Sequence, residues 1–223
     1  MPKEVRKVMG CPSIPHDPRI RVLLVEDHPL TRAGLRDLIN DARDMTVVGE
    51  VGNGEDALKC MEAVCPDVAV LDMRLPDMRG SNIIGELLAI CPNTAVLALS
   101  SFAFPAEVEH VLANGALGYI LKDAARREVV AAVRSVYGGK RVVRGRIAED
   151  LAEFMMIEKL TERERAVLAR MAEGGSNKVI SRQLCIAPST VKVHVGNILF
   201  KLDASNRMDA VVRAAKLGLV RIS

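Results

Sequence analysis

Three carboxylates follow two short apolar runs of this chain, and their placement is the main chemical clue. Glu26 and Asp27 come directly after the run 20–25, and Asp72 follows the run 68–71. Short runs rich in Val and Leu that end at turn residues are typical of strands buried on both faces. An open α/β sheet places its ligand crevice at the carboxyl ends of such strands, so the three carboxylates are expected to converge. Anions that close repel each other strongly, which favours a bound hard divalent cation, and Mg²⁺ is expected.

An isolated Asp is more often an ordinary loop residue, and only the joint pattern indicates a site. The composition then bounds the possible functions. The chain has 223 residues, enough for one large domain or two ordinary ones, and 49% are hydrophobic. An aromatic content of 3% argues against stacking platforms for single-stranded nucleic acid. No apolar run approaches the length of a membrane span.

The cysteines are odd in number, scattered and without C-x-x-C spacing. This pattern predicts reduced thiols in a cytoplasmic protein and no zinc site. The five positions are Cys11, Cys60, Cys65, Cys91 and Cys185.

Charge is shared unevenly along the chain. Residues 158–223 hold 12 Lys and Arg against 6 Asp and Glu, whereas residues 1–157 hold 19 against 22. The difference predicts two domains, of which the second faces a polyanion. Before them, residues 1–19 contain four prolines and no sustained apolar core, so they are expected to form a flexible N-terminal extension rather than a signal peptide.

Strand and helix patterns alternate through residues 20–137. Expected strands cover 20–25, 46–51, 67–71, 94–99 and 118–121, and expected helices cover 29–40, 54–64, 82–90, 105–114 and 123–137. Five βα units in this length predict an α/β fold with a doubly wound parallel sheet, and the flavodoxin-like strand order 2-1-3-4-5 is the leading choice.

Four motifs in this region carry a family resemblance. They are V-E-D-H after the first strand, L-D-M-R-L-P-D-M-R-G around Asp72, L-S-S after the fourth strand and G-Y-I-L-K-D at the fifth. Together they resemble the receiver domain of two-component response regulators. The resemblance implies that Asp72 is the phosphoacceptor for a sensor histidine kinase. It also implies that Glu26 and Asp27 hold Mg²⁺ together with the backbone carbonyl of Arg74.

Three further residues take roles from the same resemblance. Lys122 would place a point charge on the phosphoryl oxygens, although it could be a solvated surface lysine. The hydroxyl of Ser100 would bond a phosphoryl oxygen, with Ser101 as the alternative one residue on. Tyr119 matches the aromatic that swings inward once that hydroxyl is recruited, or it is a plain strand aromatic. The implied switch is a bistable face of fourth helix, fifth strand and fifth helix, biased by a new dianion.

The remaining residues predict a linker and a helical domain. Gly138 and Gly139 end the last receiver helix, and 138–157 is expected to be a linker, irregular and basic at 140–146, with a short helix from Ile147. Residues 158–223 predict an all-α domain of four helices, the first opened by a capping box at Thr161. Two short helices joined by a tight turn, 177–184 and 188–202, fit a helix-turn-helix.

The second of these helices has two distinct faces. Val191, Val195, Ile198 and Leu202 form an apolar stripe for the core, and the opposite face includes Ser189 and Asn197. Lys192 and Val193 lie where base edges are reached, on a guanine and a thymine methyl respectively. Better placed for phosphates are Thr190, His194, Lys201 and Lys178. Each lysine could instead be only a solvated charge.

This domain closely resembles the LuxR-type effector domain through L-T-E-R-E-R-A-V-L, S-N-K-V-I-S-R-Q-L and S-T-V-K-V-H-V-G-N-I-L-F-K-L. With the receiver, residues 20–221 are similar to the NarL/FixJ family. The family dimerises through its last helix, which implies contacts in or beside Met208, Val211, Val212 and Ala215. Gly196 and Phe200 depart from the polar or basic residues usual at their positions. Phe200 is expected to pack on the receiver or to touch DNA.

The resemblance implies a transcription regulator rather than an enzyme, with at most autophosphotransfer and autodephosphorylation. Phosphorylation would release the effector domain and favour a homodimer on a double-stranded DNA operator, and RNA polymerase is a further candidate partner. Two alternatives compete. One is a phosphohydrolase of the haloacid dehalogenase type, whose D-x-D motif at the first strand differs from Asp72-Met73-Arg74. The other is a receiver that works unphosphorylated as a protein-interaction module.

Overall fold

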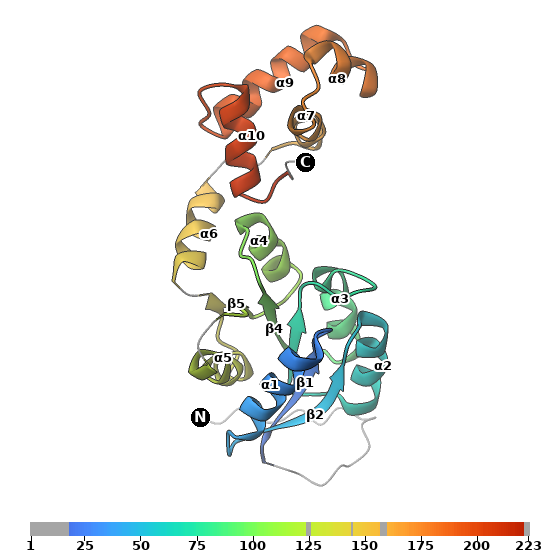
Figure 1. The fold of residues 1–223 in the computed structure, drawn as a ribbon, viewed down its shortest axis with the longest axis vertical. Coiled ribbons are helices and arrows are strands. Elements are labelled where there is room, and N and C mark those ends of the chain that lie inside the picture. The colour runs from blue at the N-terminus through green and yellow to red at the C-terminus, as the bar shows by residue number, and fades with distance from the viewer. Residues whose placement is uncertain (1–17, 124–125, 144, 157–159, 221–223) are drawn as a thin grey trace.

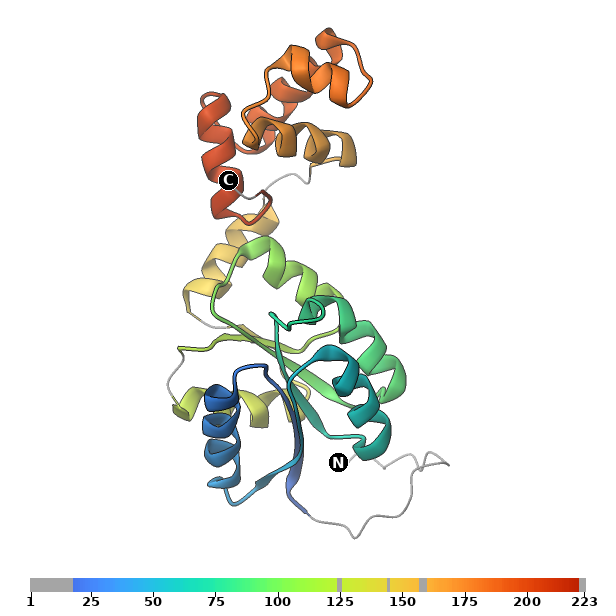
Figure 2. The same cartoon turned by 45° about the vertical axis from the view of Figure 1, so that its right-hand side comes forward.

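The computed structural model describes residues 18–123, 126–143, 145–156 and 160–220. These residues form an α/β domain and a smaller helical domain, joined end to end by one helix (Figures 1 and 2). The extension expected over 1–19 lies outside the described residues except for its last two positions. Among the described helices, none has both the length and the apolar character needed to span a bilayer.

One parallel sheet organises the larger domain. Its strands are β1 (Ile20–Val25), β2 (Met45–Val51), β3 (Val68–Asp72), β4 (Ala95–Ser100), β5 (Gly118–Leu121) and β6 (Val142–Val143). The spatial order is β2-β1-β3-β4-β5-β6, so the predicted order 2-1-3-4-5 is confirmed and extended by one strand. Consecutive strands that run parallel require crossover connections, and helices supply them here.

Helices cover both faces of the sheet. α1 (Pro29–Asn40) and α5 (Arg126–Tyr137) pack on one face, and α2 (Gly54–Val64), α3 (Gly80–Ile90) and α4 (Pro105–Ala113) on the other. Alternate strand residues divide between the two cores, because successive side chains of a strand point to opposite faces. In β3, for example, Val68 and Val70 join the first core while Ala69 and Leu71 join the second.

Local sequence signals explain where several helices begin. Pro29 and Pro105 occupy the first turns of α1 and α4. A backbone N–H in the first turn has no acceptor within the helix, so proline loses no hydrogen bond there. Asn53 caps α2 by accepting a hydrogen bond from the N–H of Asp56. These starts place the loops that precede the helices at one edge of the sheet.

The segment expected to be an irregular linker contains structure that the sequence did not predict. Val142 and Val143 form β6, parallel to β5, and the N–H of Val142 donates to the Leu117 carbonyl at 2.8 Å. An exposed edge strand leaves unsatisfied backbone groups, and a short apolar pair beside it satisfies them. α6 (Arg146–Met156) follows, where the short helix from Ile147 was expected, and it packs against α4, with Ile147 and Leu151 on the receiver core.

The smaller domain consists of α7 (Glu162–Ala172), α8 (Asn177–Gln183), α9 (Pro188–Lys201) and α10 (Arg207–Lys216) in the described residues. The predicted capping box is confirmed, since Thr161 and Glu164 exchange side-chain and backbone hydrogen bonds. The predicted apolar stripe of α9 supplies Val191 and Ile198 to the core, where neither has measurable exposure. The two short helices α8 and α9 form the helix-turn-helix expected from the sequence.

The expectation of reduced thiols is wrong for two of the cysteines. Cys65 and Cys91 form a disulfide with 5.8 Å between their Cα atoms. Each residue caps the carboxyl end of a helix, α2 and α3 respectively, and these two helices pack side by side. Twenty-six residues separate the pair, so no local spacing could reveal it. Of the other described cysteines, Cys60 is a half-buried free thiol and Cys185 an exposed one.

Candidate functional site

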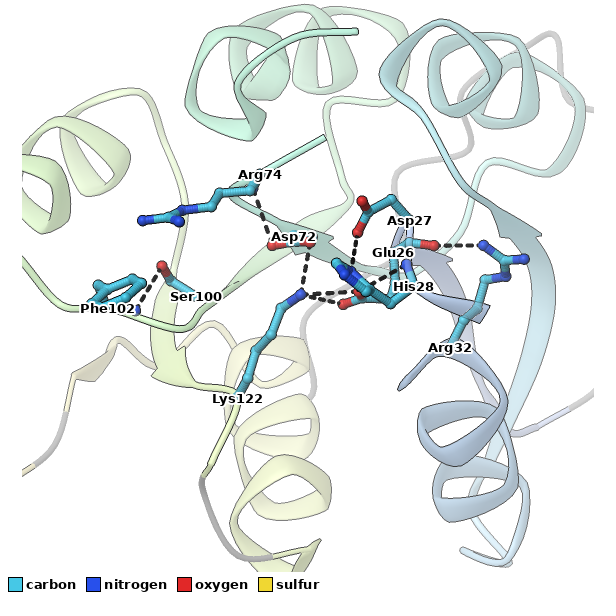
Figure 3. Close-up of polar contacts among 9 residues, drawn as sticks. All are labelled: Glu26, Asp27, His28, Arg32, Asp72, Arg74, Ser100, Phe102 and Lys122. Atoms are coloured by element: carbon cyan, nitrogen blue, oxygen red, sulfur yellow. Dashed lines mark hydrogen bonds and ion pairs between the residues drawn. The ribbon is translucent and has the colours of Figure 1, made fainter. Parts of the chain in front are cut away.

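The three carboxylates expected to converge do so at the carboxyl-terminal edge of the sheet (Figure 3). Asp72 is the last residue of β3, and Glu26 and Asp27 directly follow β1, the neighbouring strand. Side-chain ligand atoms of these residues and of His28 all lie within 4.8 Å of one another. Glu26 and Asp72 are only 1% and 2% exposed, which separates this cluster from ordinary surface acids.

Lys122 is the cation of the cluster. Its Nζ donates to Asp72 Oδ2 at 2.7 Å and lies 2.7 Å from Glu26 Oε2. Burial opposes the lysine's charge, but the hydrogen bonds to Asp72 and Glu26 together raise the pKa of Lys122 above its usual value. The ammonium group is therefore held charged beside Asp72.

The donor set fits a magnesium ion. Lys122 pairs with two of the three carboxylates, so the cluster keeps a net negative charge, and carboxylate oxygens are ligands that hard divalent cations prefer. Glu26 Oε2 is buried and meets Lys122 as an ion pair without hydrogen-bond geometry, which leaves it acceptor capacity. A cation held by Glu26, Asp27 and Asp72 would offset the mutual repulsion of these groups.

Two residues beside the cluster received no role from the sequence. His28 Nδ1 lies 2.6 Å from Asp27 Oδ1, and the His28 N–H donates to Glu26 Oε1 at 3.2 Å. Arg32, in the first turn of α1, donates to the Glu26 carbonyl at 2.6 Å. The V-E-D-H motif could have indicated His28, because it is adjacent to the pair. Arg32 is six residues from Glu26, and only the packing of α1 brings its side chain to the Glu26 carbonyl.

Asp77 belongs to the sequence motif around Asp72, which assigns it no role. Its two carboxylate oxygens accept hydrogen bonds from the N–H groups of Gly54 and Glu55, each at 3.0 Å. The Gly54 N–H and its neighbours lower the pKa of Asp77, because they stabilise the ionised form. Asp77 thereby ties the loop after β3 to the start of α2.

Ser100 and Tyr119 meet at the backbone of Phe102. Ser100 ends β4 with 2% exposure and its Oγ accepts from the Phe102 N–H at 3.3 Å, whereas Ser101 is exposed. Tyr119 is fully buried, and its hydroxyl donates to the Phe102 carbonyl at 2.7 Å. Burial raises the pKa of Tyr119 above its usual value. The ring is thus already directed inward in this structure.

Phe102 also contacts the loop that carries the phosphoacceptor candidate. The Arg74 N–H donates to Asp72 Oδ1 at 3.1 Å, while the Arg74 guanidinium points away from Asp72 and lies 4.6 Å from the Phe102 ring centre (Figure 3). Phe102 stacks on Phe104, with ring centres 6.0 Å apart. A cavity of about 790 Å³ lies between this loop, the start of α4 and the end of α10.

Most of the residues expected to contact DNA lie on the surface of the helical domain. Those exposed are Lys178 on α8 and Ser189, Thr190, Lys192, Val193 and Asn197 on α9. His194 is half-buried, and its Nδ1 is buried without a hydrogen-bond partner among the described residues. Phe200 is 81% exposed, so it does not pack against the receiver in this structure.

Lys201 corrects the sequence-based expectation. Its Nζ lies 3.1 Å from Glu164 Oε2, and its side chain is only 12% exposed. A lysine held in a largely buried ion pair is not available to a DNA phosphate, so Lys201 is removed from the set of DNA contacts. The pairing joins residues 37 positions apart, which explains why the helical pattern of α9 alone could not show it.

The residues of α10 expected to form the dimer face are partly exposed and partly buried in their own domain. Met208 and Val212 are 71% and 38% exposed, whereas Val211 is 6% exposed and belongs to the core of the helical domain. Val211 is therefore corrected to a core residue, since its side chain is occupied within its own domain. Ala215 is half-buried and lines the cavity between the domains.

Comparison with known proteins identifies the families of both domains. Residues 22–134 match the family model of the response regulator receiver domain, and residues 158–214 match that of bacterial regulatory proteins of the luxR family. The chain belongs to the NarL/FixJ family of response regulators. It is accordingly a regulator of transcription with a receiver and a LuxR-type DNA-binding domain, and this family match favours the regulator over the phosphohydrolase alternative.

Two regulatory proteins are similar to this chain over most of its length. The transcriptional regulatory protein YxjL of Bacillus subtilis is 35% identical over 214 residues, covering 91% of this chain and 98% of that protein. The nitrate/nitrite response regulator protein NarL of Escherichia coli is 34% identical over 200 residues, covering 86% and 93%.

Solved structures share the fold. The response regulator ChrA of a heme-sensing two-component system superposes with a TM-score of 0.53 at 31% identity, covering 91% of this chain and 99% of that one. RcsB of Salmonella typhimurium superposes with a TM-score of 0.73 at 21% identity, covering 88% and 100%. The second likeness supports the two-domain architecture alone.

Proposed function

We propose that Asp72 accepts a phosphoryl group from a sensor histidine kinase and that this modification controls DNA binding by α9. The observation that carries the proposal is the pairing of a buried carboxylate with a charged lysine, at the sheet edge where α/β folds bind ligands. Perturbed and coupled charges in such a crevice are typical of functional sites.

The transfer requires little covalent machinery from the protein. A carboxylate oxygen of Asp72 forms the new bond to phosphorus while the bond to the donor's leaving group breaks. Lys122, already beside Asp72 Oδ2, contacts the transferred oxygens and offsets their charge. Glu26, Asp27, Asp72 and the backbone carbonyl of Arg74 are the proposed ligands of Mg²⁺. When bound, the ion neutralises charge that would otherwise repel the phosphodonor.

Ser100 and Tyr119 are proposed to read the modified state. The Ser100 hydroxyl ends the strand next to β3 and would bond a phosphoryl oxygen. Its present partner is the Phe102 N–H, and the Tyr119 hydroxyl bonds the carbonyl of the same residue. A change at Ser100 therefore reaches the β4–α4 loop through one shared residue. This coupling supports the switch role of Tyr119 over that of a plain strand aromatic.

The DNA-reading surface is proposed on the outer face of α9. Lys192 and Val193 are assigned to base edges in the major groove, on a guanine and a thymine methyl. Phosphate and flanking contacts are assigned to Lys178, Ser189, Thr190, His194 and Asn197. Self-association is assigned to the part of α10 that its own core leaves uncovered, namely Met208, Val212 and Ala215.

The proposed partners follow from these surfaces. A kinase reaches the crevice at Asp72, a double-stranded operator reaches α9, and a second copy of the chain reaches α10. RNA polymerase is a further proposed partner of a DNA-bound regulator. Because a transcription regulator acts on the chromosome, we place the chain in the cytoplasm.

The test is phosphoryl uptake from acetyl phosphate with Mg²⁺. Asp72→Asn should abolish uptake, because an amide is a far weaker nucleophile than a carboxylate. Asp77→Asn is a matched control, since Asp77 lies in the same loop and accepts backbone hydrogen bonds but is far less buried. Undiminished labelling of the Asp72→Asn protein would overturn the proposal. Unlabelled wild-type protein would favour the unphosphorylated interaction module instead.

A further inference from the structure

We propose that the last turn after α10 is a latch, seated on the first turn of α4, and that Arg74 controls the seat. The latch consists of Leu217 and Gly218, and the seat consists of residues 104–106. The inference rests on the proposed phosphorylation of Asp72, and it assigns the contact that this modification releases. Both cartoon views show the end of α10 beside α4 and α6 (Figures 1 and 2).

The contact joins two complementary helix ends. The Ala106 N–H in the first turn of α4 donates to the Leu217 carbonyl at the carboxyl end of α10, at 3.1 Å. First-turn N–H groups and last-turn carbonyls have no partner within their own helices. The partial charges of the two ends are also opposite. The hydrogen bond therefore satisfies one group from each domain.

Gly218 makes the close approach possible. It follows the last turn of α10 with φ +79°, a left-handed conformation that glycine adopts without strain. A Cβ on this residue would lie 2.5 Å from the Phe104 Cβ, which is closer than side-chain atoms can approach. The receiver surface at Phe104 thus accepts a bare backbone and excludes any side chain here.

The seat is connected to the phosphoacceptor through two phenylalanines. Phe104 stacks on Phe102, and Phe102 lies under the Arg74 guanidinium at 4.6 Å. Arg74 is only two residues from Asp72 and donates its N–H to Asp72 Oδ1. The Phe102 N–H is held by Ser100, a residue proposed to bind the phosphoryl group. Two supports of the Phe102–Phe104 pair therefore lead directly to the modified site.

Phosphorylation would withdraw both supports. A phosphoryl group on Asp72 adds close to two negative charges and strong acceptor oxygens. Guanidinium groups prefer such oxygens to an exposed ring face, so Arg74 would turn from Phe102 toward the phosphoryl group. Ser100, once bonded to a phosphoryl oxygen, would no longer accept from the Phe102 N–H. The loosened stack would then release Gly218, and Ala215 on α10 would become available for self-association.

Hydrogen exchange at the Ala106 amide tests the latch in the full-length protein. This N–H has no partner within α4, so its protection reports the contact with Leu217. In unphosphorylated Gly218→Ala, exchange at Ala106 should be at least about tenfold faster than in wild type. Gly174→Ala is the matched control. Gly174 has φ +80° and follows α7 in the same way. A Cβ at this position would have no atom within 4 Å, so Gly174→Ala carries the same backbone strain without a contact to the receiver.

A second pair of variants tests the link to Asp72. Arg74→Ala should speed exchange at Ala106 without phosphorylation, whereas Arg79→Ala should not. Arg79 is an exposed arginine of the same loop, also lines the interdomain cavity and has no ring contact among the described residues. Acetyl phosphate with Mg²⁺ should speed exchange in wild type, with radiolabel uptake measured on the same sample.

The outcomes separate the two proposals. Equal, slow exchange in wild type and Gly218→Ala would overturn the latch. Labelled wild-type protein whose Ala106 amide stays protected would overturn the link between the latch and Asp72. Absence of label would instead overturn the proposed phosphorylation, while the comparison of Gly218→Ala with Gly174→Ala would still test the latch itself.

Discussion

Lys122 in the receiver and Lys201 in the effector domain both lie against buried carboxylates, but the balance of charge differs. Lys122 faces Glu26 and Asp72, with Asp27 beside them. Lys201 faces Glu164, and the same Glu164 oxygen also accepts from the Thr161 N–H at 2.9 Å. The receiver cluster keeps excess negative charge, whereas the effector pair is neutral.

The difference distinguishes a reactive site from a structural contact. A largely buried, neutral and hydrogen-bonded pair holds two helices together, here α7 and α9. A buried cluster with more carboxylates than cations is destabilised by its own repulsion unless another cation is supplied. Such strain is retained only where a ligand uses it, so the excess charge indicates function more clearly than burial does.

The largest expected effect comes from removing Lys122 of the receiver. Lys122→Met should lower the rate of phosphoryl uptake from acetyl phosphate by about 10²–10³-fold, because a positioned charge on the transferred oxygens is lost. Lys59→Met is the control, since Lys59 pairs with Glu55 on the exposed surface of α2. Uptake rates for the two variants, measured at equal Mg²⁺, provide the comparison. Similar rates would contradict the assigned role of Lys122.

Removing Lys201 of the effector domain should affect the stability of that domain instead of phosphoryl uptake. Lys201→Met leaves Glu164 with one charged partner fewer and should lower the free energy of unfolding of the effector domain by about 2 kcal/mol. Phosphoryl uptake should not change. Lys192→Met, on the exposed face of the same helix, should weaken DNA binding and leave stability intact. Urea denaturation of wild type, Lys201→Met and Lys192→Met measures the three stabilities. An unchanged unfolding midpoint for Lys201→Met would contradict the structural role of Lys201.

The smallest expected effect is the acid sensitivity of the effector domain. Burial opposes the charge of Glu164, but the Thr161 N–H and Lys201 outweigh it and lower the pKa of Glu164. A carboxyl group with a lowered folded pKa contributes stability above its unfolded pKa of about 4.3, and this is lost as the pH falls through the folded value. The fall in stability below about pH 5 should be weaker in Lys201→Met. An equal fall in the free energy of unfolding with pH in wild type and Lys201→Met would contradict the expectation.

Much of the receiver could be predicted because its information is local. Apolar runs and helical spacing placed β1, β3 and β5 within about one residue, and the rule for parallel sheets placed Asp72 beside Glu26 without any knowledge of packing. The capping box at Thr161 and the exposed face of α9 were equally local, since both depend on residues three or four positions apart.

What only the tertiary structure decided are contacts between distant segments. The disulfide of Cys65 with Cys91, the pairing of Lys201 with Glu164 and the meeting of Ala106 with Leu217 each join elements whose own patterns are complete without the partner. Periodicity shows which face of an element is apolar or exposed, but not which other element will cover it. That choice depends on how whole helices and sheets pack, because the free energy of a long-range contact exists only once both sides are in place.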